Sequence, residues 1–385
     1  MDSKEYLTNK SFCPIPWTGL MYNFDGTVKT CIRSSAAIGN IKDTPIIDIL
    51  NGPLNTETRT NMLADTPGNR CAPCYELETD KNSFDIISDR IFYLKELKSV
   101  SKATYDTANN FNLHTIDVRW SNLCNFACVY CEPKFSSKWS TELKVVHDRP
   151  SDAQQQDFKN YIFEHAAQLK HVYLAGGEPL LMKENFELLQ LLKQVNPQVN
   201  LRINTNLSKV DTKIFDLICT FPIVHWIVSI ESIEEEYEYI RFGGRWQDFL
   251  DNLITIKKLN HKISFNMLHF LLNYQSLFTC IEFLQGMGFH NNSFIVGALL
   301  GPDYLNIRHL PPTMLASVEQ TLQTWIDKKL GFLLDNGLQN MLQYIKNPII
   351  TNIDNCLLEI AIMDKRRNID SKKIFTEFYS LIERQ

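Results

Sequence analysis

The sequence lacks the features of a secreted or membrane-inserted chain. No apolar run approaches the ~18–20 residues that span a bilayer, and the opening MDSKEYLTNKSF has no apolar stretch typical of a secretory signal. The chain also contains no internal repeat and no low-complexity tract. We therefore expect a cytoplasmic protein in a reducing compartment, with no membrane partner.

Positive charge is not in excess either. The chain has 39 Lys and Arg against 44 Asp and Glu, a formal net charge of −5. Nucleic-acid binding through phosphate contacts needs clustered basic residues. The only dense basic stretch, at 364–373, is more typical of a solvated helix face or loop. We therefore expect no nucleic-acid partner, and modification of an RNA is the weaker of the enzyme alternatives considered below.

The chain is instead rich in apolar residues and cysteine. With 44% hydrophobic and 11% aromatic residues, its 385 residues can build a sizeable core, as two domains or as one large domain with an appendage. Clustered cysteines in a reducing compartment indicate metal or iron–sulfur chemistry rather than disulfides. The ten cysteines form an N-terminal set, a tight group and three isolated residues: Cys13, Cys31, Cys71 and Cys74; Cys124, Cys128 and Cys131; Cys219, Cys280 and Cys356.

Two patterns of secondary structure divide the chain. Residues 1 to about 100 are irregular, with a hairpin expected around Asp25-Gly26 and helical spacing over 84–100. From about residue 114, short apolar strands alternate with amphipathic segments, and the predicted strands are 114–120, 171–176, 201–206, 225–232, 263–270 and 293–300. After Pro311-Pro312 the pattern is helical to the end of the sequence.

Six β-then-α units predict an α/β fold with a parallel sheet and helical crossovers. Six units are too few for a closed eight-stranded barrel and suit an open, partial (βα)6 TIM-like barrel. We therefore predict three domains: an N-terminal domain over 1–100, the barrel over 111–310, and a helical C-terminal extension over 311–385.

The carboxyl ends of the predicted strands carry unusual residues. In parallel α/β folds the functional site lies at these ends. Here they hold the three-cysteine loop, "GGEP" at 176–179, "NTN" at 204–206 and "SIES" at 229–232. Four polar or glycine-rich strand ends at one edge are hard to explain by packing, so we expect the site there.

The loop with Cys124, Cys128 and Cys131 has the spacing C-x3-C-x2-C. Three thiolates can ligate three irons of a 4Fe-4S cube. The fourth iron then stays open, as a catalytic metal site requires. The alternative is a zinc knuckle that takes its fourth ligand from elsewhere in the chain.

Together, "CNFACVYC" and the "AGGEP" that follows one strand later resemble the radical S-adenosylmethionine (SAM) superfamily. The resemblance implies that the amine and carboxylate of SAM chelate the open iron. An electron from the reduced cube then cleaves SAM to methionine and a 5′-deoxyadenosyl radical, which abstracts a substrate hydrogen. The cluster and SAM carry this chemistry, while the protein orients the reactants and excludes competing reactions.

The resemblance also implies roles for residues at the strand ends. Gly176 and Gly177 would let the backbone approach the methionine part of SAM, and Glu178 would accept a hydrogen bond from its ammonium group. Tyr130 matches an aromatic position near the adenine. The remaining candidates would bind the ribose or the carboxylate, and they are Asn204, Asn206, Ser229, Glu231 and Arg241. The alternative for each single residue is an ordinary polar strand end.

The four N-terminal cysteines form a second pattern: "FCPIPW", "GTVKTC" and "RCAPC". It resembles the auxiliary-cluster module called SPASM in its shorter "twitch" form, here placed before the barrel. The resemblance implies that Cys13, Cys31, Cys71 and Cys74 hold a second 4Fe-4S cluster, as an electron conduit or a structural staple. A zinc ribbon is the alternative, because four cysteines also suit tetrahedral zinc.

The family resemblance implies an enzyme that modifies a peptide or a natural-product intermediate, by crosslinking, epimerisation or oxidation. Dehydrogenation of a small molecule and modification of a protein or RNA are alternatives, and a non-catalytic iron–sulfur or zinc scaffold is the alternative from another class. We expect an electron donor such as flavodoxin or ferredoxin. The isolated cysteines Cys219, Cys280 and Cys356 lie in apolar segments and should be buried, although one of them could donate a hydrogen atom to a substrate radical.

Overall fold

The computed structural model describes residues 9–79, 88–96, 105, 107–109, 111–347, 349–350 and 352–384. The chain separates into two compact units. Unit 1 comprises Met1–Leu123, Lys144–Asn204 and Asp211–His225, and unit 2 comprises Cys124–Leu143, Thr205–Val210 and Trp226–Gln385. Within the described ranges, no helix has both the length and the apolar character needed to cross a membrane.

The strands of unit 1 follow the order β3-β2-β1-β4-β5-β6. β1 (Gly19–Asn23) and β2 (Thr27–Lys29) form an antiparallel hairpin, with Gly26 at φ +88° in the turn, which confirms the predicted hairpin. β3 (Gly39–Asn40) pairs with β2, while β1 pairs in parallel with β4 (Thr115–Arg119). β5 (His171–Leu174) and β6 (Asn200–Thr205) continue in parallel beside β4.

Strands β4, β5 and β6 have two different faces. One face carries aliphatic side chains with no exposed surface: Ile116, Val118, Val172, Leu174, Leu201 and Ile203. The other face carries polar and aromatic residues that are mostly half-buried, such as Arg119, Tyr173 and Arg202. A parallel strand covered by apolar packing on both faces would be hydrophobic throughout, so this alternation marks the second face as a place for polar contacts.

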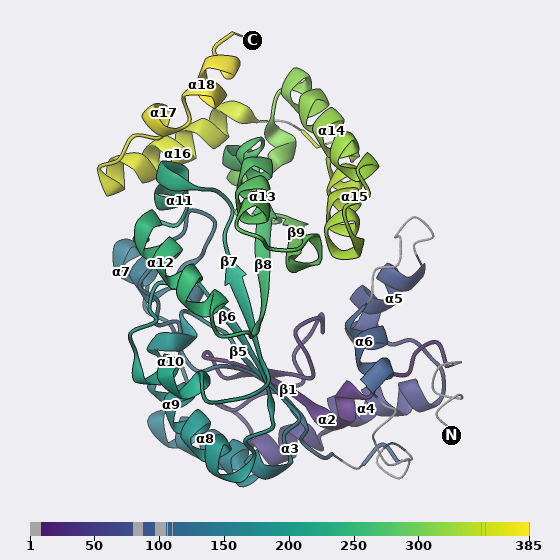
Figure 1. Cartoon of the computed structure of the whole chain (residues 1–385). Coiled ribbons are helices and arrows are strands. Elements are labelled where there is room, and N and C mark those ends of the chain that lie inside the picture. The colour runs from purple at the N-terminus through teal and green to yellow at the C-terminus, as the bar shows by residue number, and fades with distance from the viewer. Residues whose placement is uncertain are drawn as a thin grey trace. The chain divides into compact units, whose positions relative to one another are not determined.

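The helices of unit 1 belong to two stretches of sequence. The N-terminal ones are α2 (Ile15–Thr18), α3 (Ile46–Leu50), α4 (Pro53–Leu63), α5 (Ala72–Thr79) and α6 (Asp89–Glu96). The barrel contributes α8 (Asp152–Glu164), α9 (Lys183–Val195) and α10 (Lys213–Ile218), which lie on one side of β5 and β6 in Figure 1. Of the helix predicted over 84–100, α6 is seen, and the rest lies outside the described residues.

Unit 2 holds the later strands and the C-terminal helices. Its strands are β7 (Val224–Ser229), β8 (Lys262–His269) and β9 (Phe294–Ala298), and they neighbour one another in sequence order. β7 belongs to this unit from Trp226 on, and β8 pairs in parallel with β9. Its helices are α7 (Ser137–Leu143), α11 (Glu234–Ile240), α12 (Trp246–Lys257), α13 (Ser276–Gly286), α14 (Pro312–Asp327), α15 (Phe332–Lys346), α16 (Ile353–Arg367), α17 (Ser371–Ile374) and α18 (Thr376–Ile382). α14 and α15 pack side by side (Figure 1).

These elements confirm the predicted fold class. All six predicted barrel strands are present, each close to its expected bounds, with helices between them. In the part of the chain that the structure describes, the parallel sheet is open rather than closed into an eight-stranded barrel. The region after Pro311-Pro312 is helical as expected. The division into domains 1–100, 111–310 and 311–385 stays a prediction.

Candidate active site

The three-cysteine loop follows β4 in the sequence, and local hydrogen bonds hold it. The Val129 N–H donates to the Ile240 carbonyl at 2.8 Å, and Trp139 Nε1 donates to the Cys128 carbonyl, also at 2.8 Å. Cys128 is buried, while Cys124 and Cys131 are half-buried. The loop therefore has a fixed backbone and presents two of its three thiols partly to solvent.

Two polar side chains donate toward the sulfur atoms of this loop. Arg241 Nη1 lies 4.0 Å from Cys128 Sγ, and Asn206 Nδ2 lies 3.8 Å from Cys124 Sγ. Asn206 is itself held by Asn125, whose Oδ1 accepts from Nδ2 at 3.1 Å. Donors beside thiolate sulfurs stabilise an anionic cluster and tune its reduction potential. The loop thus fits a negatively charged iron–sulfur cluster.

A buried network ties Tyr130 to two other predicted site residues. Arg241 donates to both carboxylate oxygens of Glu231, from Nη2 at 2.7 Å and from Nε at 2.8 Å. The Tyr130 hydroxyl donates to Glu231 Oε1 at 2.9 Å. Glu231 and Arg241 are only 1% and 2% exposed. Burial raises the pKa of Glu231, while the Arg241 charge opposes that rise. Arginine keeps its proton in proteins, so we treat the two as an ion pair.

The predicted SAM-binding glycines lie close to the chain segment that precedes Cys124. A Cβ added at Gly177 would lie 2.1 Å from the Leu123 carbonyl oxygen, and one at Gly176 would lie 3.0 Å from that of Ser121. Gly176 also adopts φ +109°, a conformation that other residues rarely take. The backbone N–H of Glu178 donates to the Leu123 carbonyl at 2.7 Å. The glycines thus allow the chain after β5 to lie directly against the backbone of Ser121 and Leu123.

The other predicted site residues lie at the expected strand ends. The Glu178 side chain is fully buried, and its Oε1 accepts from the Leu180 N–H at 3.1 Å. Asn204 is half-buried on β6, and Ser229 is half-buried at the end of β7. In unit 2 the structure brings the three cysteines together with Tyr130, Asn206, Glu231 and Arg241. Their assigned contacts with SAM stay predictions.

Supporting residues of the loop were not identified from the sequence. Ser137 accepts from the Cys124 N–H at 3.1 Å, and Ser136 Oγ donates to the Phe126 carbonyl at 2.5 Å. Both lie in "FSSKWS", a stretch without a pattern that distinguishes it from any helix start. Only the three-dimensional contact shows that this segment fixes the loop.

The four N-terminal cysteines line one cavity of unit 1. Cys13 precedes α2, Cys31 follows β2, and Cys71 and Cys74 lie at the start of α5. The other lining residues are Ile15, Pro16, Thr30, Arg33, Ser34, Asp89, Arg90 and Tyr93. Cys13 and Cys71 also pack against a hydrophobic cluster, formed by Phe12, Trp17, Met62, Leu94 and Tyr105. Distant parts of the sequence thus converge on one cysteine-lined space.

The thiols of this cavity would be neutral by themselves and would become thiolates only on binding a metal centre. Burial, and then the nearby thiols, raise the pKa of Cys31 to about 12 and that of Cys71 to about 11. Neutral thiols result near pH 7, and a bound metal centre supplies the positive charge that stabilises thiolates. In the described ranges no three His, Cys, Asp or Glu residues are close enough to hold a single metal ion. A cube binds its four cysteine ligands through separate irons, whereas zinc needs all four around one ion.

The isolated cysteines differ in their burial. Cys280 in α13 is fully buried and Cys356 in α16 is 1% exposed, as predicted. Cys219, which caps the C-terminal end of α10, is half-buried.

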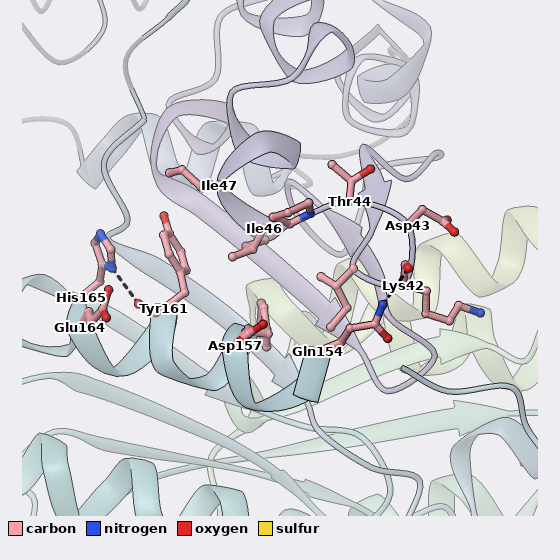
Figure 2. A pocket seen from close by; sticks show the side chains of 13 residues that line it. Lys42, Asp43, Thr44, Ile46, Ile47, Gln154, Asp157, Tyr161, Glu164 and His165 are labelled. Atoms are coloured by element: carbon pink, nitrogen blue, oxygen red, sulfur yellow. Dashed lines mark hydrogen bonds between the residues drawn. The ribbon is translucent and has the colours of Figure 1, made fainter. Parts of the chain in front are cut away.

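A separate hollow in unit 1 contains none of the predicted site residues. It has a volume of about 500 Å³ and lies between the 41–47 segment and α8 (Figure 2). Gln154 Nε2 donates to the Lys42 carbonyl at 2.8 Å, and His165 Nδ1 lies 2.7 Å from the Tyr161 carbonyl oxygen. The first of these bonds joins the two sides of the hollow, and the second lies at the end of α8.

Comparison with known protein families matches both predicted cluster regions. The model of the radical SAM superfamily matches residues 118–284, and that of an iron–sulfur cluster-binding domain, SPASM, matches residues 13–75. The first range contains the three-cysteine loop, and the second contains all four N-terminal cysteines. The first family implies a 4Fe-4S cluster and SAM as cofactors, and the second implies an auxiliary iron–sulfur cluster.

Individual relatives are distant. The GTP 3′,8-cyclase of Campylobacter lari is 22% identical over 37% of this chain and 42% of its own length. The GTP 3′,8-cyclase of Lactiplantibacillus plantarum is 27% identical over 36% of this chain and 40% of its own length. The chain thus spans about two-fifths of these curated relatives.

Two solved structures are also similar. The anSMEcpe structure with bound AdoMet shares 16% identity at a TM-score of 0.43, over 56% of this chain and 60% of that one. Streptococcus suis SuiB bound to precursor peptide SuiA shares 13% at 0.42, over 72% of this chain and 64% of that one. The two matches show a region of the SPASM iron–sulfur cluster-binding type at residues 13–75, ahead of a region of the radical SAM type at residues 118–284.

Proposed function

We propose that this protein is a radical SAM enzyme that abstracts a hydrogen atom from a peptide or a natural-product intermediate. When bound, the reduced 4Fe-4S cluster and SAM supply a 5′-deoxyadenosyl radical. The observation that carries the proposal is the three-cysteine loop, whose sulfurs receive donors from Arg241 and Asn206. Three thiolates hold three irons of a cube and leave the fourth position to SAM.

The residues around the loop have separate proposed roles. The Glu231–Arg241 pair holds the Tyr130 hydroxyl, so it positions the ring near the adenine of SAM. Arg241 uses Nε and Nη2 on Glu231 and points Nη1 toward Cys128 Sγ, so the second N–H of Nη1 would be left for the SAM carboxylate. Ser229 and the remaining acceptor capacity of Glu231 would receive the ribose hydroxyls.

In unit 1, Gly176 and Gly177 would leave the chain after β5 free of side chains for the methionine part of SAM. Glu178 would accept from its ammonium group, and Asn204 and Asn206 would bond ribose or carboxylate oxygens. The four N-terminal cysteines would hold the auxiliary cluster as a closed site, which conducts electrons or stiffens the domain. An electron donor such as flavodoxin or ferredoxin would reduce the radical SAM cluster.

The test of this proposal is the product of SAM cleavage. Anaerobically reconstituted protein, reduced with dithionite and mixed with SAM, should form 5′-deoxyadenosine. The Cys124→Ala variant should form none while keeping its circular dichroism spectrum, and Cys219→Ala should behave like the unaltered protein. Absence of the product from the unaltered protein would favour the non-catalytic scaffold, and cleavage by Cys124→Ala would refute the open-cluster assignment.

The substrate class needs a second experiment. Peptide crosslinking, epimerisation or oxidation is one possibility, and dehydrogenation of a small molecule is the other. The similarity to GTP 3′,8-cyclases is a reason to include nucleotides among the small molecules tested. Peptide and small-molecule fractions of a deuterium-labelled cell extract would each be incubated with the enzyme and unlabelled SAM. The fraction that transfers deuterium into 5′-deoxyadenosine contains the substrate.

A further inference from the structure

The second face of β4, β5 and β6 in unit 1 carries a row of charged and aromatic side chains. The strand registers place Asp117 of β4 beside Tyr173 of β5, and Tyr173 beside Arg202 of β6. Arg119 follows two residues after Asp117, on the same face of β4. Three neighbouring strands therefore present Asp117, Arg119, Tyr173 and Arg202 together.

Only one of the two arginines in this row has an acidic partner. Arg119 binds both oxygens of Asp117, from Nε at 3.1 Å and from Nη2 at 3.2 Å. Among the residues that the structure describes, Arg202 forms no ion pair, and its buried Nε has no hydrogen-bond acceptor. The row thus has one negative and two positive charges, a surplus of one positive charge, and the Asp117 carboxylate is hydrogen-bonded to Arg119 rather than to Arg202.

Aromatic rings hold the Arg202 guanidinium in place. Its central carbon lies 5.7 Å from the centre of the Tyr173 ring and 5.9 Å from that of Phe92 in α6. Arg202 is half-buried, so part of it can still reach a ligand. A planar guanidinium that is stacked on rings loses less freedom when it binds, and its fork of donors matches a carboxylate or a phosphate.

The position of Arg202 connects it with both predicted cofactor regions. Tyr173 lies three residues before Gly176, and Arg202 lies two residues before Asn204 on the same face of β6. Tyr93, the neighbour of Phe92 on α6, lines the cavity of the four N-terminal cysteines. An anion bound at Arg202 would thus lie on the strands that lead to the SAM-binding motifs and next to the auxiliary-cluster cavity.

We propose that Arg202, in cation–π contact with Tyr173 and Phe92, binds an anionic group of the substrate, a carboxylate or a phosphate. This assignment rests on the proposed function, because it names a part of the substrate that the radical modifies. The Arg202 guanidinium would bind this anionic group through a charge-assisted, bidentate contact. The neighbouring Asp117 and Arg119 form an ion pair whose charges cancel.

The test measures anion binding directly. Inorganic phosphate, succinate and GTP would each be titrated calorimetrically into the anaerobically reconstituted full chain. At least one should bind with one site per chain, and the arm that binds distinguishes phosphate from carboxylate. Arg202→Gln should weaken that affinity about tenfold or more, the size expected for a lost charge-assisted hydrogen bond. No binding by the unaltered protein, or unchanged binding by Arg202→Gln, would overturn the assignment.

Two further variants control this experiment. Arg308→Gln removes an equal charge from another half-buried arginine that stacks on a tyrosine, Tyr344, and should leave the affinity unchanged. Arg202→Lys keeps the charge but loses the fork, so its affinity should lie between those of Arg202→Gln and the unaltered protein. If Arg202→Gln does not fold, Arg202→Lys decides: full affinity contradicts the proposal and reduced affinity supports it.

Formation of 5′-deoxyadenosine by the unaltered protein is measured in the same preparation. Loss of that product alone would count against the proposed function, whereas loss of anion binding alone would count against Arg202.

Discussion

Glu231 and Arg241 form the most deeply buried ion pair of the candidate site, and the Tyr130 hydroxyl depends on it. Replacing Glu231 with Gln leaves the Arg241 charge buried without its partner. Such a loss costs about 3–5 kcal/mol of stability. We expect Glu231→Gln to unfold at a clearly lower denaturant concentration and to bind SAM more weakly, measured by urea unfolding and by titration with SAM.

The matched control is Glu187→Gln on α9. Glu187 pairs with Lys159 at 2.8 Å, but its side chain is 27% exposed. A partly solvated pair of this kind contributes about 0–1 kcal/mol. Equal destabilisation by the two variants would show that burial of the Glu231–Arg241 pair does not matter.

Gly177 tests the close approach of the GGEP segment to the backbone of Leu123. An alanine there would place its Cβ 2.1 Å from the Leu123 carbonyl oxygen, so the backbone must move. We expect Gly177→Ala to lose about 1–3 kcal/mol, as overpacked sites do, and to lose SAM affinity. Gly286→Ala, at the end of α13, meets no atom within 4 Å and should be neutral or slightly stabilising. Unfolding curves and SAM titrations of both variants check this; normal SAM binding by Gly177→Ala would contradict it.

The sequence identifies site residues where a motif fixes the chemistry, and misses those that depend on contacts. The cysteine spacing and the GGEP motif predict the loop and the strand end because the residues that act together there are also close together in the sequence. Ser137 and Arg202 could not be found in this way. A serine at a helix start and an arginine on a strand are common, and only their neighbours in space give them a role.

At the scale of elements, the barrel strands were predictable because their apolar pattern is local. The parallel pairing of β1 with β4 was not predictable. The hairpin itself follows from the Asp25-Gly26 turn, but its register against Thr115–Arg119 joins segments about a hundred residues apart. No periodic pattern in either segment encodes which strand will be its neighbour. Short elements such as β3, of two residues, also lack a detectable pattern.

The start of α5 is the element that decides the nature of the N-terminal site. Cys71 and Cys74 lie there, and both line the four-cysteine cavity. If the cavity holds a second cube, the reconstituted protein contains about eight irons and eight sulfides per chain. A Cys71→Ala, Cys74→Ala double variant should then retain about four of each, and Cys219→Ala should retain all. About four irons in the unaltered protein, with zinc present, would show a zinc site instead.

For the molecule as a whole, one buried histidine links stability to pH. His269, at the end of β8, has no exposed surface, and its Nε2 donates to the Tyr274 carbonyl at 3.0 Å. Its Nδ1 has no partner among the described residues. Burial lowers the pKa of His269 from 6.5 to about 4. The folded protein therefore keeps this ring neutral over a range in which the unfolded chain takes up a proton.

The sign of the effect follows from proton uptake. Between pH 6.5 and 4 the unfolded state binds more protons at His269 than the folded state, so stability falls as the pH falls through this range. The expected loss between pH 7.5 and 5.5 is on the order of 1 kcal/mol. His269→Gln can keep a donor to the Tyr274 carbonyl but cannot titrate, so its unfolding midpoint should depend less on pH over this range. His290→Gln, at an exposed position, should retain the pH dependence of the unaltered protein. Urea unfolding of the three proteins at both pH values gives the comparison, and equal slopes for all three would rule out His269 as the linked group.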